Sequence, residues 1–242
     1  VESRGLGDVY KRQEFAESED FQRQRQYWYE RFSGELPVLD LPLDYSRPEI
    51  QSFEGDEYEF KLPEEMTLEL KKLAHETGST MYMVLLAAFN IVLYKYSGQK
   101  DIIVGSVISG RDNPDLFETI GMFVNTLPMR NNPSDNKTFL EFLEEVKETT
   151  LDAFRNQDYP FEELVENLKL RRAAERNPIF DVVFTWQSST IPDLSGGGLK
   201  VSQYQETVGI SKFDMCMYAE EKNKEISFII EYCTRLFSRD SC

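Results

Sequence analysis

The sequence predicts a mixed α/β fold, an α+β sandwich in which a mixed β-sheet has helices packed mainly on one face. Segments with helical and with strand periodicity alternate along the chain, and a run of strand-like segments follows near its end, which together favour this arrangement. Hydrophobic residues make up 40% of the 242 residues, so a large core can form. The predicted helices cover residues 18–32, 63–77, 80–97, 138–156 and 161–170, and the predicted strands cover residues 54–62, 101–108, 122–130, 179–188, 199–206, 212–220 and 225–233.

The predicted helices begin and end at residues that commonly cap helices. Thr80 precedes an apolar segment that closes at Gly98, and Thr138 with Glu141 forms a capping box at the start of a later helix. The segment after Thr80 is apolar on nearly all sides, which indicates a buried helix. Two shared helix faces are predicted, one formed by Phe21, Arg25, Trp28 and Phe32 and one by Phe139, Phe142, Leu143, Val146, Thr150 and Phe154.

The strand predictions rest on β-branched runs and on alternation. Residues 101–108 are rich in isoleucine and valine and are predicted to form an interior strand. Residues 212–220 and 225–233 are predicted to pair as an antiparallel hairpin across residues 221–224. Three prolines within residues 36–48 favour an extended connector before the first strand.

The composition disfavours several classes of function. The chain has 27 Lys and Arg residues against 43 Asp and Glu residues, and the resulting charge of −16 argues against nucleic acid and against an anionic membrane surface. The apolar run 81–94 is interrupted by Asn90 and is shorter than the ~18–20 residues that a bilayer span needs. No secretory leader pattern is visible. We expect a cytoplasmic protein that binds neither nucleic acid nor a membrane.

The numbers and positions of histidine and cysteine limit the catalytic and metal-binding chemistry that the chain can support. The chain has a single histidine, His75, so schemes that need a histidine pair or a His-rich metal site are excluded. His75 lies on a charged helix with no nucleophile near it, and we expect a structural place for it. Cys216, Cys233 and Cys242 lack the spacing of metal ligands and are expected to be free thiols, so no metal site is expected.

Two polar residues differ from their surroundings. On its predicted strand, Asn125 shares a face with Phe123, so its amide needs a partner, which is either backbone or a ligand. Gly121, just before them, permits a close approach of backbone. Asp158 precedes Pro160, and capping of the helix that Pro160 begins is favoured over a catalytic role for Asp158.

Three segments, in this order, resemble successive signatures of the condensation domains of nonribosomal peptide synthetases. They are residues 120–130 (IGMFVNTLPMR), 156–162 (NQDYPFE) and 176–180 (RNPIF). Three ordered matches are far more specific than a single short motif. The resemblance runs from about residue 18 to residue 237, and residues 1–17 are expected to be a poorly ordered or non-native tail.

The resemblance implies a fold like that of chloramphenicol acetyltransferase, with two related lobes and a tunnel between them. In this family an acceptor amine attacks a donor thioester, both substrates being held on phosphopantetheine arms of carrier proteins, and an amide bond forms. The family's active-site signature, His-His-x-x-x-Asp-Gly, does not occur in this sequence. We therefore expect residues 18–242 to be the C-terminal lobe with the N-terminal lobe absent, without a catalytic base and inactive alone.

The same resemblance assigns roles to residues of this chain. The residues expected to line the substrate tunnel are Asn125, Gly121, Ser106 and Phe123. The residues expected to have structural roles in the motifs are Arg111, Arg130, Asp158, Pro160, Phe161, Arg176 and Asn177. Structural ion pairing is the preferred interpretation for both Arg111 and Arg130.

The implied partners are the N-terminal lobe of the same domain, peptidyl and aminoacyl carrier proteins, and a downstream adenylation domain. No cofactor is expected to bind tightly, because the phosphopantetheine arm belongs to the carrier proteins. Two alternatives stay open. One is a non-catalytic lobe that only binds carrier proteins, and the other is half of an epimerisation or heterocyclisation domain, against which the segments 121–126 and 156–162 favour condensation.

Overall fold

The structure is a computed structural model of the chain, and it describes residues 15–110, 123–170, 173–187 and 209–242. Its centre is a mixed sheet with the strand order β1-β6-β5-β4-β2-β3. The strands are β1 (Gly55–Leu62), β2 (Ile102–Ser109), β3 (Val124–Asn131), β4 (Val182–Gln187), β5 (Met215–Lys222) and β6 (Glu225–Cys233). The central pairs β2–β4 and β4–β5 are parallel, and the outer pairs are antiparallel. The predicted strand 199–206 lies outside the described residues.

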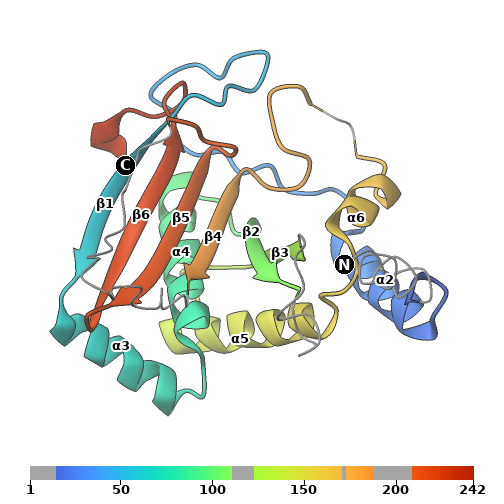
Figure 1. The fold of residues 1–242 in the computed structure, drawn as a ribbon, viewed down its shortest axis with the longest axis horizontal. Coiled ribbons are helices and arrows are strands. Elements are labelled where there is room, and N and C mark those ends of the chain that lie inside the picture. The colour runs from blue at the N-terminus through green and yellow to red at the C-terminus, as the bar shows by residue number, and fades with distance from the viewer. Residues whose placement is uncertain (1–14, 111–122, 171–172, 188–208) are drawn as a thin grey trace, which may run out of the picture.

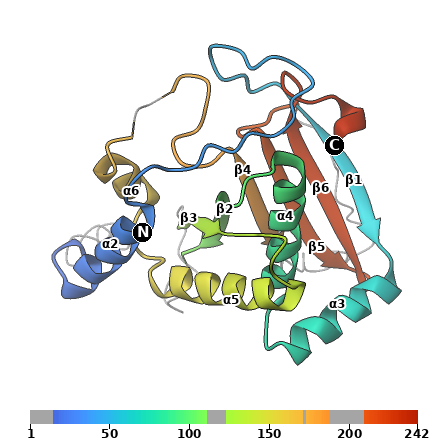
Figure 2. The same cartoon turned by 180° about the vertical axis from the view of Figure 1, so that it is seen from behind.

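The described helices differ in where they lie relative to this sheet. They are α2 (Glu19–Phe32), α3 (Glu64–Glu76), α4 (Met81–Ser97), α5 (Phe139–Arg155) and α6 (Phe161–Asn167). Figures 1 and 2 show α4 and α5 on the same side of the sheet, whereas no described helix covers the side of β1, β6, β5 and β4 that faces the viewer in Figure 1. Helices α2 and α6 lie together beyond the β3 edge. The predicted fold class is therefore confirmed.

The core lies between the sheet and its helices, and of the described helices α4 contributes the most buried residues. Thr80 caps α4, with its hydroxyl oxygen accepting from the Met83 amide at 3.3 Å, and Gly98 ends the helix at φ +70°. Phe184 of β4 packs against Tyr82 and Phe89 of α4, with ring centroids 5.6 and 6.0 Å apart. Burial of α4 was predicted from its apolar surface and is confirmed, because its buried residues lie along most of its length.

Two predictions about helix faces are wrong. Gln24, and not Arg25, shares the buried face of α2 with Trp28, because α2 contacts a loop through the side that carries both residues. Phe154, predicted for the core, is 36% exposed. It lies in the last turns of α5, where its ring stacks on Tyr82.

The strand boundaries also differ from the prediction where side chains compete with the sheet. Arg176 binds the carboxylate of Asp181, so the chain turns there and β4 begins only afterwards. The predicted β5–β6 hairpin is present, but its turn is tighter than expected. Asn223 and Lys224 form the turn with φ values of +54° and +69°.

Candidate functional site

Asn125, in the second position of β3, holds the loop between α5 and α6. Its Nδ2 donates to the carbonyl oxygens of Gln157 and Tyr159 at 2.7 and 3.0 Å. Its Oδ1 accepts from the amides of Thr126 at 2.9 Å and Phe161 at 3.2 Å. Of the two partners that the sequence left open for this amide, the structure shows the backbone. The role of Asn125 as a tunnel residue stays a prediction.

Helix α2 holds the same loop. Trp28 Nε1 donates to the carbonyl oxygen of Asn156 at 2.7 Å. Gln24 Nε2 donates to Oδ2 of Asp158 at 3.1 Å, and Gln24 Oε1 accepts from the Asp158 amide at 3.1 Å. The predicted capping of α6 by Asp158 is therefore wrong. The N-cap residue is Pro160, which has no side-chain cap, and the Asp158 carboxylate binds α2 instead.

A row of aromatic rings connects this loop to the sheet. Phe161, the first residue of α6, packs against Phe180 with 5.4 Å between ring centroids, and Phe180 stacks on Phe213 at 5.7 Å. Gly105 of β2 leaves room for the Phe180 ring, since a Cβ at Gly105 would overlap it. Helix α6 is thus anchored to the sheet through Phe161 and Phe180.

The hydroxyl of Ser106 is buried beneath α4. Ser106 is 1% exposed, and its Oγ accepts a hydrogen bond from the Tyr82 hydroxyl at 2.8 Å. Burial raises the pKa of Tyr82, so this phenol stays protonated and acts as the donor. Ser106 pairs with Leu127, two residues from Asn125, so Ser106 and Asn125 project from the same face of the sheet.

Arg130 forms the ion pair that was expected of it. Its Nε and Nη2 donate to the two carboxylate oxygens of Asp101 at 2.9 and 2.6 Å, and Asp101 raises the pKa of this guanidinium. Arg130 Nη1 donates to the carbonyl oxygen of Arg31 at 2.9 Å, and Arg31 Nη2 donates to the carbonyl oxygen of Arg130 at 2.7 Å. This reciprocal contact fastens the end of α2 to β3.

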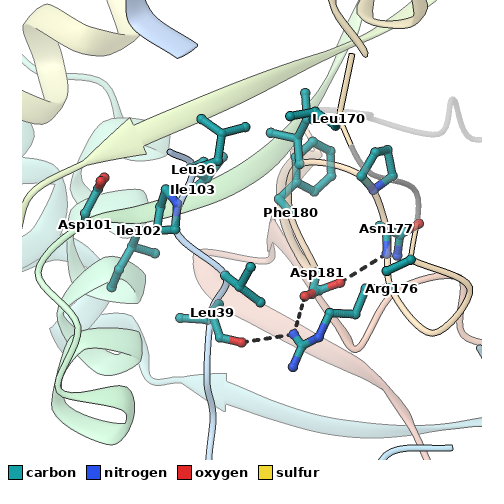
Figure 3. A pocket seen from close by; sticks show the side chains of 15 residues that line it. Leu36, Leu39, Asp101, Ile102, Ile103, Leu170, Arg176, Asn177, Phe180 and Asp181 are labelled. Carbon is teal, nitrogen blue, oxygen red and sulfur yellow. Dashed lines mark hydrogen bonds and ion pairs between the residues drawn. The ribbon is translucent and has the colours of Figure 1, made fainter. Parts of the chain in front are cut away.

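A cavity of about 210 Å³ lies between the connector after α2 and the segment before β4 (Figure 3). Arg176 Nη1 donates to Oδ2 of Asp181 at 2.7 Å and to the carbonyl oxygen of Leu39 at 3.2 Å. The amide of Asn177 donates to Oδ1 of Asp181 at 3.2 Å. Burial raises the pKa of the Asp181 carboxyl, and the nearby Asp214 carboxylate adds to the rise, while Arg176 opposes it. These contacts join the connector to the sheet.

The predicted residues therefore fall into separate places. Those that meet at the α5–α6 loop are Asn125, Asp158, Pro160 and Phe161. Arg176 and Asn177 lie at the cavity, and Phe123 directly precedes β3. Arg111 and Gly121 lie outside the described residues. The sequence reasoning missed Gln24, although its position one helical turn before Trp28 indicates the buried face.

Within the described part of the chain, no group of histidine, cysteine, aspartate or glutamate side chains is placed to hold a metal ion. No described helix is by itself long and apolar enough to cross a bilayer, although the bent pair α3 and α4 passes on length and composition together. The three cysteines are free, as predicted, and His75 is exposed on α3.

Solved structures identify the class of domain that this fold represents. A four-domain nonribosomal peptide synthetase bound to AMP and glycine matches with a TM-score of 0.83 at 22% identity, over 93% of this chain and 18% of that chain. The complex of the X-domain and OxyB from teicoplanin biosynthesis matches at 0.81 and 25%, over 92% and 50%. The first condensation domain of the calcium-dependent antibiotic synthetase matches at 0.77 and 19%, over 96% and 49%. The fold is that of condensation-type domains.

Comparisons of sequence point to the same class of domain as the solved structures. The family model of the condensation domain matches residues 7–242. Bacitracin synthase 3 of Bacillus licheniformis is 47% identical over 94% of this chain and 4% of its own length. Tyrocidine synthase 3 of Brevibacillus parabrevis is 49% identical over 95% of this chain and 4% of its own length. The chain belongs to the condensation-domain family of nonribosomal peptide synthetases, and it spans a small fraction of these relatives.

Proposed function

We propose that residues 18–242 form the C-terminal lobe of a condensation domain that makes an amide bond between two carrier-bound thioesters. The observation that carries the proposal is the family match over residues 7–242. The likeness to the first condensation domain of the calcium-dependent antibiotic synthetase supports the assignment to one lobe, since it covers 96% of this chain and 49% of that chain.

The proposed reaction balances without a cofactor bound to this chain. The acceptor's amine attacks the carbonyl carbon of the donor thioester, so a C–N bond forms and the C–S bond breaks. The donor's phosphopantetheine sulfur leaves as the thiolate and receives the proton that the amine loses. Both arms belong to the partner carrier proteins. These carrier proteins are parts of a synthetase that also contains an adenylation domain.

The chain's own contribution to this reaction is a wall of the tunnel. Asn125, Ser106 and Phe123 are the described residues proposed to line it. The base of the family's signature is not among these 242 residues, whose single histidine is the exposed His75. The wall confines the amine and the thioester near one another, and such confinement supplies a large part of the rate in reactions of two bound reactants.

A lobe that only binds a partner protein is the second candidate. One of the solved likenesses is a complex of the X-domain with OxyB, so a domain of this fold is found bound to another protein. In that case the chain binds its partner while no bond is made. Half of an epimerisation or heterocyclisation domain is a further alternative, which a different product distinguishes.

Replacement of the matching segment in full-length tyrocidine synthase 3 by this chain tests the proposal. Both neighbouring carrier domains are loaded, and the amide-linked product on the acceptor arm is followed by mass spectrometry. We expect product at a rate within roughly tenfold of that of the unmodified synthase. A folded hybrid that loads both carriers and forms no amide contradicts the proposal, and retained carrier binding then supports the second candidate.

A further inference from the structure

Gln24 is a buried polar side chain with all of its hydrogen-bonding capacity in use. It lies on α2 and is 1% exposed. Its Oε1 accepts from the amides of Asp158 and Tyr159, both at 3.1 Å. Its Nε2 donates to Oδ2 of Asp20 at 3.0 Å and to Oδ2 of Asp158 at 3.1 Å. A primary amide offers two donors and two acceptor positions, and all four are occupied.

The loop that Gln24 binds depends on side chains for its backbone hydrogen bonds. Within residues 156–161, one backbone group bonds to Trp28, two bond to Gln24 and three bond to Asn125. Buried backbone groups need such partners, because an unpaired one loses its hydrogen bonds to water without replacement. The place of the loop is therefore set by α2 and β3 together.

Tyr159 connects the two carboxamides directly. Its amide donates to Gln24 Oε1 at 3.1 Å, and its carbonyl oxygen accepts from Asn125 Nδ2 at 3.0 Å. A displacement of this residue away from Gln24 also moves the acceptor that orients the Asn125 carboxamide. Gln24 and Asn125 are thus linked through the backbone of a single residue.

We propose that Gln24 is a positioning residue of the condensation site, which fixes Asn125 through the 156–161 loop. This inference rests on the proposed function, because Asn125 is there assigned to the tunnel wall. Gln24 contacts no substrate in this scheme. Its effect on the reaction passes through the Tyr159 backbone.

The charges around Gln24 make the carboxamide difficult to replace. Asp20 on α2 and Asp158 on the loop each present a carboxylate oxygen to its Nε2, and Arg23 binds both Asp20 and the side chain of Asn156. A carboxylate at this position keeps the two acceptor bonds but loses both donors and faces two like charges. Protonation removes that repulsion, so the Gln24→Glu variant is expected to regain loop order as the pH is lowered.

The first test measures the clamp in the 242-residue chain itself. Hydrogen exchange is followed at the Asp158 and Tyr159 amides in Gln24→Ala and Gln24→Glu. The matched controls are Gln26→Ala and Gln26→Glu, because Gln26 is exposed on the same helix and bonds to Glu30 one turn away. We expect protection of both amides to fall at least tenfold in Gln24→Ala, by loss of the bonded acceptor. Unchanged protection there overturns the inference.

The second test measures the reaction in the tyrocidine synthase 3 hybrid. In Gln24→Ala we expect kcat per folded molecule to fall roughly tenfold, with KM for the loaded acceptor carrier within about twofold, because wall geometry changes and carrier docking does not. Gln24→Glu is expected to recover kcat at lower pH, relative to the Gln26→Glu control.

The outcomes separate this inference from the function on which it rests. An inactive hybrid with Gln24 unchanged contradicts the proposed function and the positioning role together. An active hybrid in which Gln24→Ala keeps its kcat per folded molecule overturns the positioning role alone. A loss of activity that only follows the folded fraction, with kcat per folded molecule constant, also overturns it, since a purely structural residue behaves in that way.

Discussion

At several positions in this fold, a single side chain supplies the hydrogen bonds that backbone groups elsewhere receive from helices and strands. The sequence identifies Asn125 as a polar residue on an apolar face, but its partners lie in a loop about thirty residues further on, and no local pattern indicates them. Gln24 is less visible, because a glutamine in a charged helix is typical of a solvated face. The sequence pattern before Pro160 predicts that Asp158 caps the helix. That prediction is wrong because the Asp158 carboxylate instead contacts α2, which a local pattern does not indicate.

Removal of the Asn125 carboxamide tests how much its hydrogen bonds contribute to the stability of the fold. Asn125→Ala leaves the Gln157 and Tyr159 carbonyls and the Phe161 amide without their partner. We expect the free energy of unfolding to fall by about 2–3 kcal/mol, since partly buried backbone groups lose their bonds. Urea unfolding measures this change, with the exposed Asn136→Ala as the control. A loss no larger than that of the control contradicts the assignment.

Gly105 is packed directly against the Phe180 ring. Gly105→Ala forces the Phe180 ring to move, and overpacking of this kind costs about 1–3 kcal/mol. Phe180→Leu makes room for the added methyl group but has a cost of its own. In a double-mutant cycle measured by urea unfolding, we expect the paired variant to lose less stability than the sum of the single variants. Additive losses are the result that disagrees.

Elements as a whole were more predictable than their ends. The capping box of Thr138 and Glu141 starts α5 as expected, because capping is decided within a few residues of sequence. The start of β4 was predicted too early, since the pairing of Arg176 with Asp181 depends on the folded turn. The β5–β6 turn was predicted too long because its two central residues, Asn223 and Lys224, lack the glycine usual at such turns.

The β5–β6 turn contains a residue with a strained backbone conformation, and a substitution can remove that strain. Lys224 adopts φ +69°, a left-handed conformation that costs a residue with a side chain about 1–2 kcal/mol. Lys224→Gly also removes an exposed ion pair with Glu64, which contributes only ~0–1 kcal/mol. We therefore expect Lys224→Gly to raise the melting temperature by a few degrees. A lowered melting temperature in calorimetry counts against this balance.

The sheet order is the feature of the whole molecule that the sequence leaves open. Gly55 pairs with Cys233 across the β1–β6 edge, and Gly105 pairs with Val183 at the β2–β4 junction. Pairings between distant residues are fixed by the packing of the complete core, so periodicity predicts the strands but not their neighbours. The three signature segments indicate the family because they can be recognised in their order along the chain. Their recognition does not require knowledge of which strands pair.

Carboxyl groups give the whole molecule a defined response to acid. Burial raises the pKa of Glu57 and Asp181, so the folded state binds these protons more tightly and stability rises as the pH falls from neutral. Hydrogen bonds lower the pKa of a second set, whose stabilisation is present above the ordinary values of 3.8 and 4.5 and is lost as the pH falls through the lowered ones. That set comprises Asp20, Asp44, Asp135 and Glu141.

These two sets of carboxyl groups together determine the pH at which the protein is most stable. We expect the urea midpoint at constant ionic strength to rise from about pH 7 to about pH 5 and to fall again below about pH 4. Relief of repulsion at a net charge of −16 acts in the same direction over the first range. A midpoint that declines steadily from neutral pH downward is incompatible with this account.

Reconstitution from two parts tests directly whether this chain is one lobe of a two-lobe condensation domain. The 242-residue chain, the separately produced N-terminal lobe of the matching tyrocidine synthase 3 condensation domain, and both together are each mixed with loaded donor and acceptor carrier proteins. Mass spectrometry detects the amide-linked thioester. We expect this product only when both parts are present. Product from the 242-residue chain alone, or no product from a stable complex of the two parts, contradicts it.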